Sequence, residues 1–117
     1  MTVVSVGSTV PEQREIDAEA IARADVIVAD VVTEVVRDTG DFIAARDACV
    51  DAGDRVVSLA DLVRGQCGGR TDGGQIALYK SVGSAVQDLA VAAMCMRAAL
   101  DGGLGTQAPI PVEVVLK

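Results

Sequence analysis

The stretch from residue 68 to residue 88 constrains the fold more than any other part of this chain. It reads GGRTDGGQIALYKSVGSAVQD: a glycine-rich polar loop, an apolar run from Gln75 to Tyr79 that is typical of a strand, and a serine before a long apolar segment. Ser81 is therefore expected to cap a helix that starts at Val82. Unpaired N–H groups at a helix start favour a polar or anionic ligand group, although an ordinary cap without a ligand explains the same pattern.

The rest of the chain alternates between short apolar runs and segments with helical spacing. Runs of β-branched and small residues predict strands at Thr2 to Val6, Val26 to Asp30 and Arg55 to Leu59. Strands that alternate with helices indicate an α/β fold built from parallel βαβ units. Five helices are predicted. The first follows Asp17 and ends at Arg23, the second runs from Thr33 to Thr39 before the stop glycine Gly40, and the third runs from Asp41 to Ala52 before the stop glycine Gly53. The fourth follows Ser58 and ends near Gly65, and the fifth runs from Val82 to Leu100.

The composition limits both the core and the partners. With one Tyr, one Phe and no Trp, the core must consist of Val, Ala, Leu and Ile, which favours tight packing of helices on a sheet. A net charge of −7 without a basic cluster makes nucleic acid an unsuitable partner. Because the chain has no histidine, we expect neither a conventional zinc site nor a His-based catalytic triad, and no metal.

Cysteine usage and hydropathy suggest a cytoplasmic protein. The three cysteines are far apart in the sequence and form no CxxC pair, so reduced thiols are the simplest interpretation. Cys49 falls on the apolar face of its predicted helix, which favours a place in the core over a nucleophilic role. No signal peptide is visible, and Asp88 and Arg97 interrupt the longest apolar stretch, which argues against a membrane span.

Candidate ligand-binding residues follow the predicted strands, because ligands of open α/β sheets bind beyond the carboxyl ends of the strands. Gly7, Ser8 and Thr9 follow the first strand, where a plain turn stiffened by Pro11 is the alternative. Asp30 ends the second strand, and it could bind a ligand, remain solvated or cap the next helix. The last segment, Pro109 to Leu116, has the alternating pattern of an extended tail and is expected to pair with strands that this chain does not encode.

Four collinear segments resemble one known family. They are VGSTVPEQREID at 6–17, RADVIVAD at 23–30, GRTDGGQIALYKSVGSAVQDLA at 69–90 and GLGT at 103–106. Together they resemble the C-terminal part of the ornithine cyclodeaminase and mu-crystallin family. The resemblance implies that residues 1–78 form the second half of a Rossmann-like NAD(P)-binding domain. It also implies that residues 79–117 form an interdomain helix and a tail that returns to the substrate and dimerisation domain.

The same resemblance implies roles for individual residues. Val6 and Gly7 match a segment near the nicotinamide of NAD or NADP, and Ser81 matches a serine that faces both cofactor and substrate, with Gly83 beside the substrate. Thr9 stands where true cyclodeaminases have a catalytic aspartate. A hydroxyl group is no general base near neutral pH without an activating partner, so an imine reductase or amino-acid dehydrogenase is favoured over ornithine cyclisation.

Two kinds of assembly remain open at this point. The chain contains no GxGxxG fingerprint, so a complete dinucleotide site would need residues from another polypeptide. The expected partner is a separate chain that carries the N-terminal half, or a second copy of this chain in a homodimer. The implied substrate is a small amino or imino acid. The alternative is a non-catalytic remnant of the family that binds a ligand or simply oligomerises.

Overall fold

The computed structural model describes residues 1–106, which divide into two units, Met1–Ser84 and a second unit that begins at Ala85. The first unit is built on a sheet of four strands in the order β1-β4-β2-β3. The strands are β1 (Thr2–Ser5), β2 (Val26–Ala29), β3 (Val56–Ser58) and β4 (Ala77–Lys80). All three strand pairs are parallel, which confirms the predicted α/β class.

The order of the strands places three loops at one edge of the sheet. β4 lies between β1 and β2, so the first two strands of the chain are not neighbours. Lys80, the last residue of β4, is in register with Ser5 of β1 and with Ala29 of β2. Because the strands are parallel and end together, the segments that follow β1, β2 and β4 all start from the same carboxyl edge.

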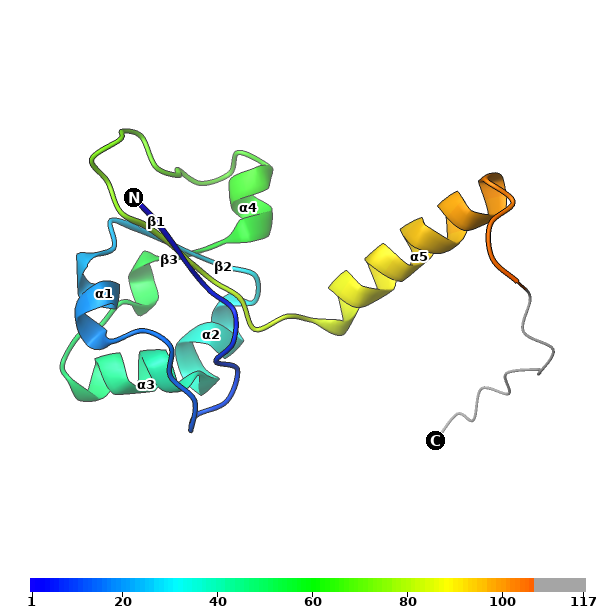
Figure 1. The fold of residues 1–117 in the computed structure, drawn as a ribbon. Helices are drawn as coiled ribbons and strands as arrows, with labels where there is room; N and C mark the ends of the chain where they lie inside the picture. The colour runs from blue at the N-terminus through cyan, green and yellow to red at the C-terminus, as the bar shows by residue number, and fades with distance from the viewer. Residues whose placement is uncertain (107–117) are drawn as a thin grey trace. The chain divides into compact units, whose positions relative to one another are not determined.

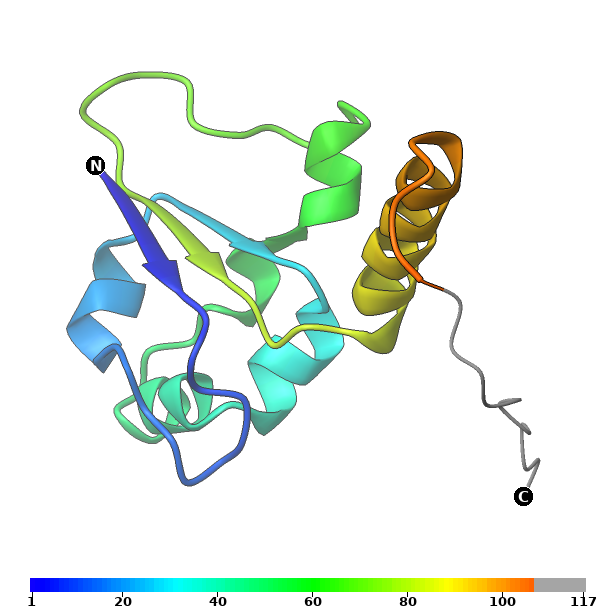
Figure 2. The same cartoon turned by 45° about the vertical axis from the view of Figure 1, so that its right-hand side comes forward.

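Short helices connect the strands, and side-chain caps explain where two of them, one after Asp17 and one after Ser58, begin. Asp17 accepts a hydrogen bond from the N–H of Ala20 at 2.8 Å, and Ser58 accepts one from Ala60 at 3.2 Å, as the sequence predicted for both caps. In Figures 1 and 2, α1, α2 and α3 gather on one side of the sheet. The helices of this unit are α1 (Ala18–Arg23), α2 (Val32–Asp38), α3 (Gly40–Asp47) and α4 (Leu59–Val63), with a 3-10 turn at Gly53–Arg55.

The core lies between the sheet and these helices and is almost free of aromatic residues. Aliphatic side chains supply nearly all of it, as the composition predicted, and Phe42 is the single aromatic member. The strands contribute Ile27, Ala29, Val56 and Leu78, and the helices contribute Ile21, Val35, Phe42 and Ala45. Alternation along β4 turns Leu78 and Lys80 towards the same buried side, so a charged residue ends a core-facing row.

The third helix differs from the prediction at both ends. Gly40 was expected to stop the preceding helix, but it is the first residue of α3. The helix ends at Asp47 and not at Ala52, because Cys49 takes a left-handed backbone conformation with φ of 60°. The early stop turns Cys49 out into solvent, so its predicted place in the core is wrong.

The second unit begins with the helix α5 (Ala85–Asp101), which starts three residues later than the sequence predicted. Its apolar side chains are exposed in the described part of this unit, and none of its residues is buried. The chain leaves the helix through Gly103 at φ of 61°, consistent with the predicted glycine stop. The extended tail predicted at 109–116 lies outside the described residues. Within residues 1–106 we find no helix with the length and hydropathy needed to cross a membrane.

Candidate functional site

Ser81 binds a neighbouring strand end and does not cap a helix, so the predicted N-cap is wrong. Its hydroxyl group donates a hydrogen bond to Oδ2 of Asp30 at 2.7 Å, across the carboxyl edge from β4 to β2. The helix itself begins only at Ala85. Residues 81–84 therefore form a separate linker after β4, and Ser81 is half-buried in it.

Asp30 holds this linker through both of its carboxylate oxygens. The N–H of Gly83 donates to Oδ2 at 2.8 Å, the N–H of Val82 donates to Oδ1 at 3.1 Å, and Oδ1 also accepts from Val31 at 2.8 Å. Partial burial by itself would raise the pKa of Asp30, but the hydrogen bonds from Ser81, Val82 and Gly83 hold that pKa below its ordinary value. The N–H groups that could have received an external anion here thus bind a carboxylate of the protein.

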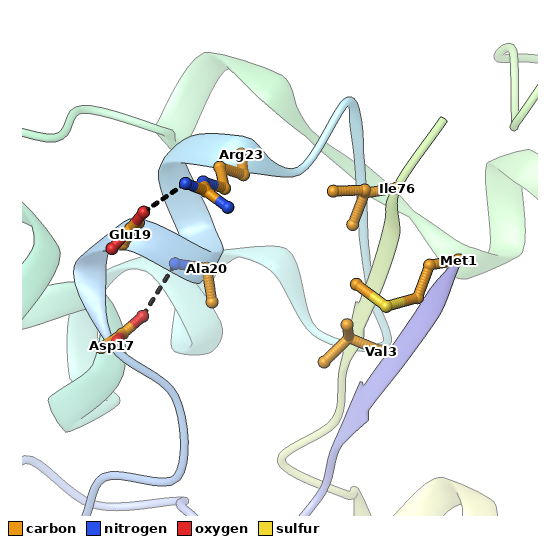
Figure 3. Close-up of a pocket in the computed structure, with 7 residues that line it drawn as sticks. All are labelled: Met1, Val3, Asp17, Glu19, Ala20, Arg23 and Ile76. Carbon is orange, nitrogen blue, oxygen red and sulfur yellow. Dashed lines mark hydrogen bonds and ion pairs between the residues drawn. The ribbon is translucent and has the colours of Figure 1, made fainter. Parts of the chain in front are cut away.

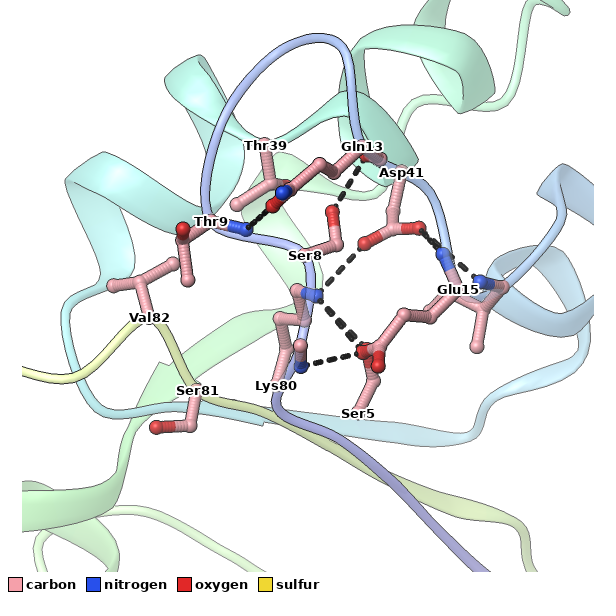
Figure 4. A network of polar contacts seen from close by, with 12 residues as sticks. Ser5, Ser8, Thr9, Gln13, Glu15, Thr39, Asp41, Lys80, Ser81 and Val82 are labelled. Carbon is pink, nitrogen blue, oxygen red and sulfur yellow. Dashed lines mark hydrogen bonds and ion pairs between the residues drawn. The ribbon is translucent and has the colours of Figure 1, made fainter.

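A buried ion pair lies at the end of β4. The Lys80 and Asp41 side chains are both 0% exposed, and Nζ of Lys80 lies 2.8 Å from Oδ2 of Asp41. The same ammonium group donates to Oγ of Ser5 at 2.8 Å and lies 3.7 Å from the Glu15 carboxylate (Figure 4). This cluster of Ser5, Glu15, Asp41 and Lys80, the lysine cluster, joins β1, β4 and the first turn of α3 to the loop that follows β1.

The carboxylates of the lysine cluster fix that loop through its backbone. Oδ1 of Asp41 accepts from the N–H groups of Glu15 at 2.7 Å and Ile16 at 3.1 Å. Burial would raise the pKa of Asp41, but the Lys80 ammonium and these N–H groups keep it below the ordinary value. Glu15 Oε2 accepts from Ser5 at 2.6 Å and from the Gly7 N–H at 2.8 Å, and these hydrogen bonds lower the pKa of Glu15. Both ends of the loop from Val6 to Ile16 are therefore held in place.

The predicted site residues gather at this edge, but they differ in exposure. In the loop after β1, the Val6 side chain is 60% exposed, Gly7 and Thr9 are also exposed, and the Thr9 N–H donates to the Gln13 side chain at 3.3 Å. Ser8 is buried and donates to the Gln13 carbonyl oxygen at 2.6 Å, so its hydroxyl group stabilises the loop and does not face a ligand. After β4, Ser81 is half-buried and Gly83 is exposed at φ of 76°.

Sequence reasoning missed Lys80, Asp41 and Glu15, which hold these segments in place. One signal was available for Lys80, because the two-residue period of β4 puts it on the same face as Leu78. A charged residue at a core-facing position requires a buried partner of opposite charge. Nothing in the local sequence identified Asp41 as that partner, because it lies in a helix far away along the chain.

A separate hollow of about 320 Å³ lies near the amino ends of β1 and β4, away from the candidate residues (Figure 3). Its charged side chains have local partners: Arg23 pairs with Glu19 at 2.6 Å, and Asp17 caps α1. Met1, Val3 and Ile76 supply its apolar wall. Among residues 1–106, no group of three or more potential metal-binding side chains occurs. The carboxyl edge therefore remains the candidate site.

Comparison with known proteins identifies related sequences and structures. The family model described as "Ornithine cyclodeaminase/mu-crystallin family" matches residues 1–103. A Delta(1)-pyrroline-2-carboxylate reductase of Bacillus cereus is 32% identical over 102 residues, which are 86% of this chain and 31% of that protein. The chain thus spans about a third of the length of the curated relatives it matches.

Two solved structures share the fold. The Delta(1)-pyrroline-2-carboxylate reductase of Thermococcus litoralis, in complex with NADH and L-proline, matches with a TM-score of 0.83 and 31% identity over 92% of this chain and 33% of that one. An archaeal alanine dehydrogenase dimer with bound NAD matches with a TM-score of 0.76 and 26% identity, covering 91% of this chain and 33% of that one.

Proposed function

Because this chain belongs to the ornithine cyclodeaminase/mu-crystallin family, we propose that it forms part of an NAD(P)-dependent oxidoreductase that acts on an amino or imino acid. The observation that supports the proposal most is the meeting of two fixed segments at the carboxyl edge. The loop with Val6, Gly7 and Thr9 is held by the lysine cluster, and the linker with Ser81 is held by Asp30. A related enzyme whose structure contains NADH and L-proline has the same fold at a TM-score of 0.83.

The residues of this edge fit the nicotinamide end of NAD or NADP. An exposed apolar side chain at Val6, an exposed glycine at Gly7 and a half-buried hydroxyl at Ser81 provide an apolar surface, close access and a hydrogen-bonding group. When bound, the cofactor would supply or accept the hydride. This chain would orient it, while the loop that binds the pyrophosphate would come from the part of the relatives that the chain does not span.

We further propose hydride transfer to or from a C=N bond, with an imine reductase or amino-acid dehydrogenase favoured over a cyclodeaminase. By the resemblance, Thr9 stands where cyclodeaminases have a catalytic aspartate, and its hydroxyl group cannot accept and release a proton near neutral pH as a carboxylate can. The Bacillus cereus and Thermococcus litoralis relatives are reductases of a cyclic imino acid, which supports the same choice. Gly83 and Ser81 would lie on the substrate side.

The test is a comparison of two reactions in the complete assembly, with the parts that this chain does not span supplied on the same or another polypeptide. We expect NADH or NADPH to be oxidised when Δ1-pyrroline-2-carboxylate is added. We expect no conversion of L-ornithine to proline with release of ammonia. Ornithine turnover without imine reduction would contradict the proposal. Replacement of Thr9 by Ala should leave much of the reductase rate, because no proton transfer is assigned to Thr9.

A second candidate is a non-catalytic module of the same family that oligomerises or binds a ligand. The exposed apolar side chains of α5 favour this alternative, since such surfaces commonly mark an interaction site. A homodimer is compatible with both candidates, and the archaeal relative is a dimer. A stable oligomer that binds NADH or an imino acid but never turns over would support the second candidate over the first.

A further inference from the structure

The hydrogen bond between Ser81 and Asp30 has a fixed direction. A carboxylate can only accept hydrogen bonds, and a serine hydroxyl has a single proton. Since Oγ of Ser81 lies 2.7 Å from Oδ2 of Asp30, the hydroxyl proton lies between these two atoms. The remaining lone pairs of Oγ can only accept a hydrogen bond from another group.

The charge and the contacts of Asp30 keep the Ser81 hydroxyl group in the role of donor towards Asp30. Burial would raise its pKa, but hydrogen bonds from Ser81 and two backbone N–H groups keep that pKa below the ordinary value, so the side chain is ionised near neutral pH. The N–H groups of Val82 and Gly83 bind both carboxylate oxygens, which prevents the carboxylate from turning away from Ser81. The charge and the orientation needed to fix the hydroxyl group are therefore both present.

We propose that Asp30 is a positioning residue that makes Ser81 a hydrogen-bond acceptor towards the ligand, so that this part of the site selects a ligand group with an N–H donor. The inference rests on the proposed function, because it takes Ser81 as a ligand-facing residue. It also excludes a ligand carboxylate at this position. Ser81 would offer such a group no hydrogen-bond donor, and the N–H groups of Val82 and Gly83 are already bound to Asp30. The negative charge of Asp30 would also repel it.

Two sources could provide the N–H donor. One is the carboxamide group of the nicotinamide, and the other is the protonated nitrogen of the amino or imino acid. Each has a matched compound that lacks the donor. The reduced 3-acetylpyridine analogue of NADH replaces the amide NH₂ by a methyl group, and tetrahydrofuran-2-carboxylate replaces the ring nitrogen of L-proline by oxygen.

The test measures the affinities of both pairs in the complete assembly. For the pair whose donor meets Ser81, we expect the N–H compound to bind about five- to tenfold more tightly, the usual effect of one hydrogen bond. Ser81→Ala should bring that ratio close to one and leave the ratio of the other pair unchanged. Asp30→Asn should lower the same ratio, because an amide NH₂ facing Oγ leaves the hydroxyl proton free to point at the ligand.

A matched control and a measurement on the chain itself complete the test. Asp72 also accepts two backbone N–H groups, from Gly74 at 2.7 Å and Gln75 at 3.2 Å, so Asp72→Asn controls for the loss of such contacts and should change neither ratio. In an acid titration followed by NMR, the amide signals of Val82 and Gly83 should shift together with the carboxyl carbon of Asp30.

The possible failures are distinguishable. If the assembly binds NADH and reduces the imine but Ser81→Ala and Asp30→Asn leave both ratios at the wild-type value, the inference is wrong and the proposed function stands. If the amides of Val82 and Gly83 do not follow Asp30, the inference is likewise wrong by itself. If the wild-type assembly binds neither NADH nor NADPH, the proposed function fails and the inference fails with it.

Discussion

Lys80 and Asp41 form a fully buried ion pair, with 2.8 Å between Nζ and Oδ2 and no exposed surface on either side chain. The pair connects the last residue of the central strand β4 to the first turn of α3. Through Asp41 and Glu15, it also holds the loop that carries Val6, Gly7 and Thr9. The stability of the unit Met1–Ser84 and the geometry of the candidate site therefore depend on the same few atoms.

Replacement of Lys80 should strongly lower the free energy of unfolding. Lys80→Met keeps much of the side-chain volume but leaves Asp41 without its cation, and the loss of one partner of a buried pair costs about 3–5 kcal/mol. Urea unfolding of the chain measures the change. Arg23→Met is the matched control, because its pair with Glu19 is 70% and 67% exposed and such pairs contribute about 0–1 kcal/mol. Equal losses for the two variants would contradict the assigned role of Lys80.

Stability should fall in acid because of Asp30 and Asp41. Both pKa values are lower in the folded state than the ordinary value of 3.8, so the unfolded chain takes up protons first as the pH decreases. The stabilisation is complete above the ordinary pKa and is lost as the pH falls through the lower, folded pKa values. Urea midpoints between neutral pH and about pH 2.5 should show this decline.

The variants Asp30→Asn and Asp41→Asn provide the control for the acid effect. Each removes one titrating group, so each should be less stable at neutral pH and should lose less further stability in acid than the wild type. An acid decline of unchanged size in both variants would assign the pH dependence to other groups.

The sequence predicted the parallel α/β class and the caps at Asp17 and Ser58, because these depend on local patterns. The sequence-based predictions were wrong where a contact with a residue distant in the sequence, or a change in backbone conformation, determines the local structure. Ser81 has the sequence context of an N-cap, but its hydroxyl group donates a hydrogen bond to Asp30, which is close only in the folded sheet. Cys49 fits the apolar face of a longer helix, but the left-handed turn at this residue ends α3 early.

The lysine cluster could not be derived from local patterns at all. The period of β4 places Lys80 towards the core, yet its partners come from β1, the following loop and α3, and their proximity depends on the strand order β1-β4-β2-β3. The sequence indicated parallel strands without showing that β4 lies between β1 and β2. Without that order, Ser5 and Lys80 cannot be recognised as neighbours.

Gly40→Ala should disturb the loop that follows β1, because Gly40 packs against the backbone of that loop. A Cβ atom at Gly40 would lie 2.4 Å from the Pro11 carbonyl oxygen and 2.3 Å from that of Gln13, so the backbone near Thr9 would have to move. We expect a loss of about 1–3 kcal/mol, as for other overpacked sites. Gly53→Ala is the control, because its Cβ would meet its nearest atoms at an ordinary 3.5 Å. Urea unfolding compares both variants, and a Gly40→Ala protein as stable as the control would refute the close contact.

The exposed apolar side chains of α5 should drive association of the chain. Val86 and Leu89 are 75% and 71% exposed, and burial of each such side chain contributes about 1.5–3 kcal/mol. Sedimentation over a range of concentrations should therefore show oligomers, or a complex with a polypeptide that supplies the parts of the relatives that this chain does not span. Leu89→Glu should shift the equilibrium towards monomer without lowering the stability of the unit Met1–Ser84, whereas Glu34→Gln on α2 should change neither. A wild-type chain that stays strictly monomeric would contradict both the proposed assembly and the oligomerising alternative.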